Sequence, residues 1–161
     1  MAPTTVSEVM TGGTECLHEN DSILDAAKRF AQLDVDALPI CGHDGRLMGV
    51  LTQRDIVARV LALGQDPAKT KAGDLTYGQP ITAWPYTTLE TAFVSMNNHN
   101  VRHLPVLEGR ELVGMASMKD ILPALFELGR GVLTEGLSFS PLPGPGDSEG
   151  GGFEWPSNRR R

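Results

Sequence analysis

One short segment, GVLTQRD at residues 49–55, combines a glycine, a hydroxyl, a cation and a carboxylate where a strand is followed by a helix. Thr52 stands at the helix start, where free backbone N–H groups and the positive end of the helix dipole favour a phosphate. Arg54 can offset phosphate charge, and Asp55 can accept hydrogen bonds from two ribose hydroxyls. Gly49 permits a close approach to the backbone. These residue types match the needs of a phosphorylated sugar.

The same combination recurs 65 residues later, with Gly114, Ser117, Lys119 and Asp120 in the corresponding positions. A second interpretation competes with ligand binding. A hydroxyl followed by an acid three residues later is close to the capping box, which satisfies the N–H groups of a helix start. Duplication copies a cap as faithfully as a ligand site, so the repeat alone leaves both interpretations open.

The recurrence extends well beyond this motif. Residues 35–64 align with residues 101–129, at an offset of 66 before the central loop and 65 after it, because the second loop is one residue shorter. The apolar residues upstream align at the same offset of 66: Ile23, Ala26 and Phe30 with Leu89, Ala92 and Met96. A period this long, occurring twice, is typical of a duplicated supersecondary unit.

Each copy has the pattern β-α-β-β-α. In the first, a cap at Asp21 or Ser22 opens a helix with apolar residues at three- and four-residue spacing. Two short strands then form a hairpin, and a second helix ends at Gly64. The expected elements of the first copy are a strand at 14–17, a helix from 22 to 33, strands at 38–41 and 47–51, and a helix at 52–63.

The second copy follows the same order. Its expected elements are a strand at 81–83, a helix from 88, strands at 103–107 and 111–116, and a helix from 117. The fold class is therefore α/β (α+β), with two repeats packed as a pseudo-two-fold module. We expect the first repeat at 5–64, a polar linker at 65–73, the second repeat at 74–130 and a disordered tail rich in Gly, Pro and Ser at 134–161.

Two β-α-β-β-α copies that carry LPI…GVLTQRDI and LPV…GMASMKDI resemble a tandem pair of CBS domains, known as a Bateman module. The resemblance covers roughly residues 5–130 and extends to the short stand-alone CBS-pair proteins of actinobacteria. It implies an adenosine-containing ligand (AMP, ADP, ATP or S-adenosylmethionine) in the cleft between the repeats. It also implies phosphate contacts from the Thr and Ser of the motif, ribose contacts from its Asp, and an adenine slot formed by Ala37, Pro39, His103 and Pro105.

For function, the resemblance implies a regulatory module that is not an enzyme and needs no obligatory cofactor. Such a module signals through conformation or oligomer state, pairs as a homodimer and acts on a separate effector protein. The residues agree, because no nucleophile–histidine–acid set and no P-loop is indicated by spacing. His103 has a second interpretation as a hydrogen-bonded structural histidine.

Composition excludes several other classes. The net charge of −6 argues against a nucleic-acid partner, whose footprint is a basic patch. No apolar run approaches the roughly 20 residues that span a bilayer. Residues 1–10 lack the charged and apolar regions of a signal peptide, so a cytoplasmic location is expected.

The two cysteines leave three interpretations open. Cys16-Leu17-His18 and Cys41-Gly42-His43 lie on strands that run side by side in a CBS repeat, so two thiolates and two imidazoles could meet at a tetrahedral zinc ion. The same cysteines could form a reversible disulfide, which cytosolic redox conditions oppose, or remain two buried free thiols. They define an alternative function, a stress-response interaction protein without nucleotide binding, controlled by a redox or zinc switch.

Overall fold

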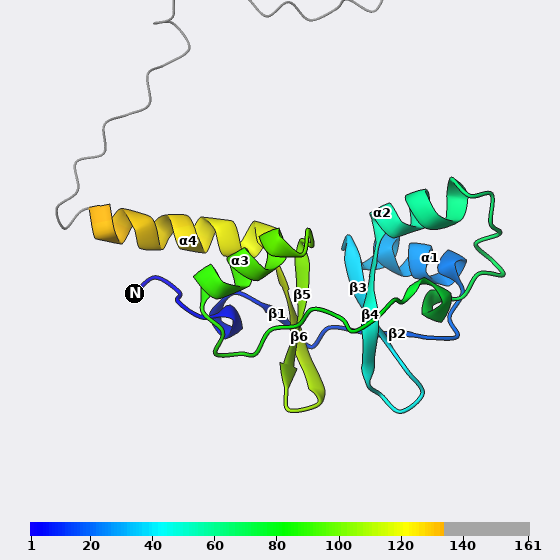
Figure 1. The fold of residues 1–161 in the computed structure, drawn as a ribbon, viewed down its shortest axis with the longest axis horizontal. Helices are drawn as coiled ribbons and strands as arrows, with labels where there is room; N and C mark the ends of the chain where they lie inside the picture. Colours follow the sequence, from blue (N-terminus) through cyan, green and yellow to red (C-terminus); the bar gives the residue numbers. More distant parts are fainter. Residues whose placement is uncertain (134–161) are drawn as a thin grey trace, which may run out of the picture.

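The computed structural model describes residues 1–133 and contains two similar α/β units side by side (Figure 1). The expected fold class is confirmed, since each unit has a small sheet with helices packed against it. The expected tail at 134–161 lies outside the described residues. None of the helices in residues 1–133 has the length and apolar character needed to cross a bilayer.

The first unit holds a three-stranded sheet in the order β2-β3-β4. Its elements are β2 (Leu17–His18), α1 (Ile23–Leu33), β3 (Ala37–Cys41), β4 (Leu47–Thr52), the short α2 (Gln53–Asp55) and a π-helix, η2 (Ile56–Leu61). β3 and β4 form the expected antiparallel hairpin, which turns at Gly45 with φ of 76°. Ala37 pairs with Thr52, so the start of β3 lies beside the start of the second helix.

The second unit repeats this arrangement with α3 (Leu89–Asn98), β5 (His103–Glu108), β6 (Glu111–Ser117) and α4 (Met118–Leu133). The β5–β6 hairpin brings His103 opposite Ser117, as β3–β4 brings Ala37 opposite Thr52. The predicted strand at 81–83 is reduced to one bridge between Ala83 and Val106.

The helix starts follow from their caps. Ser22 rather than Asp21 caps α1, because its hydroxyl accepts a hydrogen bond from the backbone N of Asp25 at 3.1 Å. Thr88 caps α3 through the backbone N of Thr91 at 3.2 Å. Each hydroxyl satisfies one of the N–H groups that a helix start leaves open.

The second helices of the two units differ. In the first unit α2 gives way to a π-helix after three residues, whereas α4 is a continuous α-helix of 16 residues. α4 runs through Pro123, which cannot donate a backbone hydrogen bond to the preceding turn.

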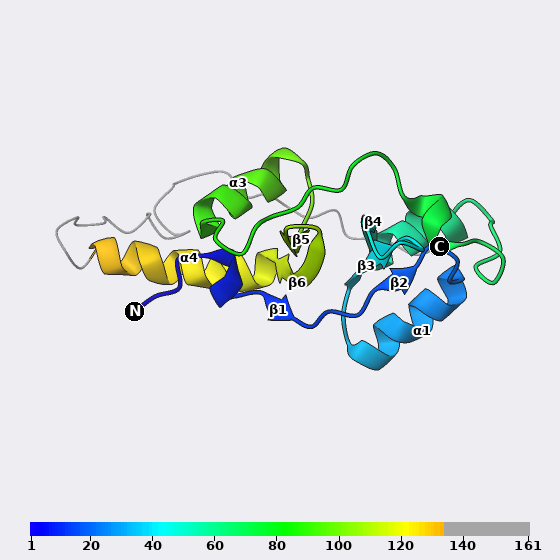
Figure 2. The same cartoon turned by 90° about the horizontal axis from the view of Figure 1, so that it is seen from below.

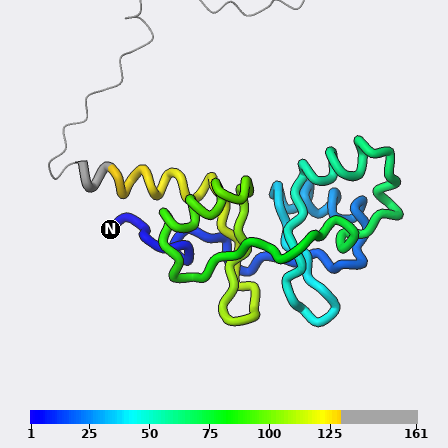
Figure 3. Tube along the Cα trace, in the orientation of Figure 1, coloured from blue at the N-terminus to red at the C-terminus, as the bar shows by residue number. Residues whose placement is uncertain are grey.

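The two units exchange short segments along the chain. The 3₁₀-helix η1 (Val6–Glu8) places Val6, fully buried, in the core of the second unit, and β1 (Thr11–Gly12) pairs with β6. Conversely, η3 (Ala72–Leu75), a 3₁₀-helix at the boundary between the expected linker and the expected second repeat, packs into the core of the first unit. Figures 2 and 3 show the two connections, near residues 13–16 and 76–82, running between the units in opposite directions.

Candidate ligand site

The first copy of the motif forms a closed capping box. The Asp55 carboxylate oxygen Oδ2 accepts hydrogen bonds from the backbone N of Thr52 at 2.9 Å and from its hydroxyl at 2.8 Å. The Thr52 hydroxyl in turn accepts from the backbone N of Asp55 at 3.1 Å. The capping interpretation therefore describes this copy of the motif, and both side chains are half-buried.

An arginine completes the surroundings of Asp55. Arg59 Nη1 lies 3.5 Å from Asp55 Oδ1, one helical turn further on. The Arg59 guanidinium also lies 4.4 Å from the centroid of the Tyr77 ring, at cation–π distance. Neither residue was among the predicted site residues. The spacing of four between an acid and an arginine on one helix is a signal that could have identified Arg59, whereas nothing local indicates Tyr77.

The second copy is simpler. The Ser117 hydroxyl donates to Asp120 Oδ2, and Ser117 is buried. The position that corresponds to Arg59 is Ala124, which is buried in the core of the second unit. Lys119 is exposed, like its counterpart Arg54.

The two strand ends beside these motifs meet across the unit boundary. His103 Nε2 lies 3.0 Å from Asp36 Oδ1, with the His103 side chain 12% exposed and Asp36 57% exposed. Because Ala37 pairs with Thr52 and His103 pairs with Ser117, this contact links the starts of β3 and β5, which lie beside the two motifs. The second interpretation of His103, as a hydrogen-bonded structural residue, fits this contact.

The remaining slot residues are enclosed by protein. Ala37 is buried, and Pro39 and Pro105 are buried further along β3 and β5. Sequence reasoning missed Asp36, and no local signal could have revealed it, because its partner is 67 residues away in the other repeat.

Close packing explains why glycine occupies both motif positions, Gly49 and Gly114. A Cβ at Gly49 would lie 3.1 Å from Thr76 Cγ2, and a Cβ at Gly114 would lie 2.7 Å from the carbonyl oxygen of Thr11. The predicted close approach thus comes from the exchanged segments of the chain itself.

An open cleft of about 520 Å³ lies at the opposite ends of the same hairpins. The turns of both hairpins and the connection between the units line it: Arg46, Leu47, Met48, Thr76, Gly78, Gln79, Pro80, Thr82, Leu107, Gly109 and Arg110. The predicted site residues, all within residues 1–133, are absent from this lining.

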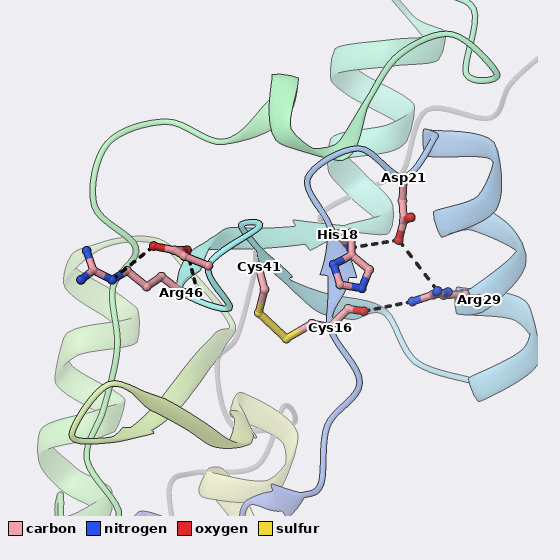
Figure 4. The surroundings of a disulfide bond; sticks show 7 residues. Cys16, His18, Asp21, Arg29, Cys41 and Arg46 are labelled. Carbon is pink, nitrogen blue, oxygen red and sulfur yellow. Dashed lines mark hydrogen bonds and ion pairs between the residues drawn. A yellow bond between two sulfur atoms is a disulfide. The ribbon is translucent and has the colours of Figure 1, made fainter.

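The cysteines are joined. Cys16 and Cys41 form a disulfide between the segment before β2 and the end of β3 (Figure 4). The backbone N of His18 donates to Asp21, and that of His43 to Glu19. The interpretation with two free thiols does not describe this structure.

The zinc hypothesis for Cys16, His18, Cys41 and His43 stays a prediction, and in this structure the two sulfurs are bonded to each other. Sulfurs bonded to each other are not thiolates, which are the form that binds zinc. Within residues 1–133 there is no group of three or more His, Cys, Asp or Glu side chains placed to hold a metal ion.

This duplicated fold defines the class of protein. The CBS domain family model matches residues 6–62 and 72–127, and the chain belongs to the CBS domain family. It is 37% identical over 118 residues to Hypoxic response protein 1 of Mycobacterium tuberculosis. This alignment covers 73% of this chain and 82% of the relative.

Solved structures give the same class. The crystal structure of Hypoxic Response Protein I with two coordinated zinc ions superposes with a TM-score of 0.69 and 37% identity, covering 74% of this chain and 98% of that one. A CBS domain protein of Pyrobaculum aerophilum, PAE2072, complexed with AMP, superposes with a TM-score of 0.70 and 28% identity. The match covers 78% of this chain and 98% of that one. The CBS domain pair of MJ0100, in complex with 5′-methylthioadenosine and S-adenosylmethionine, superposes with a TM-score of 0.69 and 28% identity. The match covers 79% of this chain and 99% of that one.

Proposed function

We propose that this CBS-pair module binds an adenosine-containing ligand (AMP, ADP, ATP or S-adenosylmethionine) between its repeats and signals through conformation or oligomer state. The observation that carries the proposal is the Asp36–His103 contact, which joins the starts of β3 and β5, the strands that pair with Thr52 and Ser117 of the two motifs. Similar structures that hold AMP or S-adenosylmethionine support the ligand class.

The chemistry of the proposed site follows from its parts. The hydroxyl at each helix start can donate a hydrogen bond to a phosphate, and the exposed cations Arg54 and Lys119 can offset its charge. The motif carboxylates can accept ribose hydroxyls. The adenine is placed beside Ala37, Pro39, His103 and Pro105, so ligand entry acts on the contact that joins the units.

Signalling then requires only differential affinity. A ligand that binds one arrangement of the two units more tightly moves the population toward that arrangement. Because Asp36 and His103 belong to different units, a ligand that displaces or strengthens their contact changes the balance between arrangements. In this proposal the module catalyses no reaction, and its output passes to a separate effector protein.

A homodimer is part of the same proposal. The second helix of each unit exposes an apolar pair four residues apart, Val57 and Leu61 in the first and Leu122 and Phe126 in the second. These pairs correspond at an offset of 65, so a second copy related by a two-fold axis can cover both with one interface. Leu61→Glu should lower the mass measured by light scattering from dimer to monomer. Leu33→Glu, at a similarly exposed leucine on α1, should leave it unchanged; a monomeric parent protein would contradict the dimer.

The ligand proposal is tested by thermal shift. Protein freed of nucleotide is heated with AMP, ADP, ATP, S-adenosylmethionine or NAD, beside a variant with Asp55→Asn and Asp120→Asn together. A ligand at 100 times its Kd should stabilise the parent by about 2.7 kcal/mol, a shift of roughly 5 to 10 °C, and should not stabilise the double variant. No shift with any of these compounds would refute the proposal.

A second candidate function rests on the Cys16–Cys41 disulfide. Here the chain is a stress-response interaction protein whose state depends on this bond, and the name of the mycobacterial relative supports a stress role. A melting temperature that does not change with nucleotides but falls strongly when the disulfide is reduced would favour this candidate. The expected cytoplasmic location stays a prediction, and a disulfide is unusual in that compartment.

A further inference from the structure

The two copies of the motif differ in how many contacts the Asp carboxylate makes with neighbouring protein groups. Asp55 Oδ2 accepts two hydrogen bonds from Thr52, and Asp55 Oδ1 faces the Arg59 guanidinium at 3.5 Å. Two neighbouring ribose hydroxyls need acceptor sites on the carboxylate that are free and within reach. In the first copy one oxygen is already doubly engaged and the other is covered by a cation.

Arg59 is held in place from several sides. Its guanidinium stacks on Tyr77, which follows the exchanged helix η3, and its side chain is 29% exposed. Its Nη2 atom is buried and has no hydrogen-bond partner within residues 1–133. The ion pair with Asp55 and the contact with the Tyr77 ring both oppose movement of the guanidinium away from Asp55.

The second copy lacks each part of this clamp. The position of Arg59 is taken by Ala124, and the position 66 residues before Tyr77 is Thr11, which has no aromatic ring. Asp120 accepts one hydrogen bond, from the uncharged Ser117 hydroxyl, and makes no ion pair with any described residue. Its other oxygen is therefore available to a ligand, and Asp120 is half-buried as a binding carboxylate should be.

We infer that the two sites are not equivalent: the ligand is held at Ser117–Asp120, one per chain, and Arg59 closes the first copy by holding Asp55. This inference rests on the proposed function and specifies which site serves it. Arg59 acts through Asp55 and is a positioning residue. The module thus keeps one copy of the motif as a structural helix cap and one as a ligand site.

The test is calorimetric titration with AMP. The parent protein should bind one AMP per chain, and Asp120→Asn, which keeps the shape of the side chain, should weaken binding by at least about 30-fold. Arg59→Met keeps the apolar stem but removes the cation, and it should raise the stoichiometry toward two. The additional site, at Asp55, should still bind AMP in the double variant Arg59→Met/Asp120→Asn. In Arg59→Met/Asp55→Asn the additional site should be lost, and only the parent site at Asp120 should remain.

A local readout separates binding from folding. In two-dimensional amide spectra of the parent protein, AMP should shift the signals of residues 117–121 more than those of residues 52–56. Binding that survives Asp120→Asn in the parent, two equivalent sites in the parent, or a stoichiometry of one in Arg59→Met would overturn this inference alone. A parent protein that binds no AMP and no other adenosine compound would overturn the proposed function and this inference with it.

Discussion

Truncation of Val6 tests the exchange of segments between the two units. Val6 is fully buried in the core of the second unit, beside residues such as Leu89 and Leu104, and its backbone N donates to Thr87 at 2.8 Å. Val6→Ala removes two methyl groups, worth about 1.6 kcal/mol by transfer. The cavity left behind adds to this, so the free energy of unfolding should fall by about 2 to 3 kcal/mol.

Urea unfolding followed by circular dichroism measures this loss. The matched control is Val94→Ala on α3, where the valine is 52% exposed and the expected change is within about 0.5 kcal/mol. Amide hydrogen exchange locates the effect, because Val6→Ala should weaken protection in α3 and β5 more than in α1. A loss below about 0.5 kcal/mol, or one confined to α1, would refute the exchange.

Three further predictions concern other parts of the fold. Gly114→Ala should destabilise by about 1 to 3 kcal/mol, and more than Gly49→Ala, because its Cβ meets a backbone carbonyl at 2.7 Å rather than a side-chain methyl at 3.1 Å; equal losses in urea unfolding would contradict this. Glu8 has its pKa lowered from 4.5 to about 2 by hydrogen bonds from backbone and hydroxyl groups of Thr4 and Thr5. The Glu8 carboxylate therefore stabilises the fold above pH 4.5, and this effect is lost as the pH falls toward 2. The loss of unfolding free energy caused by Glu8→Gln should shrink over the same pH range. A loss that stays constant between pH 4.5 and pH 2 would contradict the prediction. Reduction of the disulfide, which closes a loop of 25 residues, should cost about 3.5 kcal/mol, and the Cys16→Ser/Cys41→Ser variant should melt like the reduced protein; identical melting of oxidised and reduced protein would contradict this.

Much of the fold could be predicted because the signals are local and occur twice. The hairpins and the helices α1 and α3 follow from apolar spacing, turn glycines and hydroxyl caps, which act within a few residues. The duplicated motif likewise predicted where strands end and helices start. The loop one residue shorter in the second copy preserves the pairing of each strand start with the following helix start.

The exchange of η1 and η3 could not be predicted in the same way. The apolar residues Val6, Val9 and Met10 show that this segment needs a core, but not which of two similar cores it enters. Both cores are built from the same kinds of residue, so the choice depends on the path of the chain between the units. The spacing of the apolar residues likewise does not predict that Ile56–Leu61 forms a π-helix, η2.

The candidate site was predicted in part for a similar reason. The motif residues are recognisable from spacing, and the spacing alone left cap and ligand site indistinguishable. What separates the two copies is Arg59 and Tyr77 in one and Ala124 in the other. That difference lies in side chains outside the shared motif, so a comparison of the conserved types in the two copies does not reveal it.

The central claim is that the module binds an adenosine-containing ligand, and calorimetric titration of AMP into protein freed of nucleotide tests it most directly. We predict saturable binding with a Kd of about 1 to 100 μM, or roughly −5.5 to −8 kcal/mol. The variant with both Asp55→Asn and Asp120→Asn should show no binding while it unfolds cooperatively like the parent. Absence of saturation up to about 1 mM with AMP and with S-adenosylmethionine, or unchanged binding by the double variant, would contradict the account.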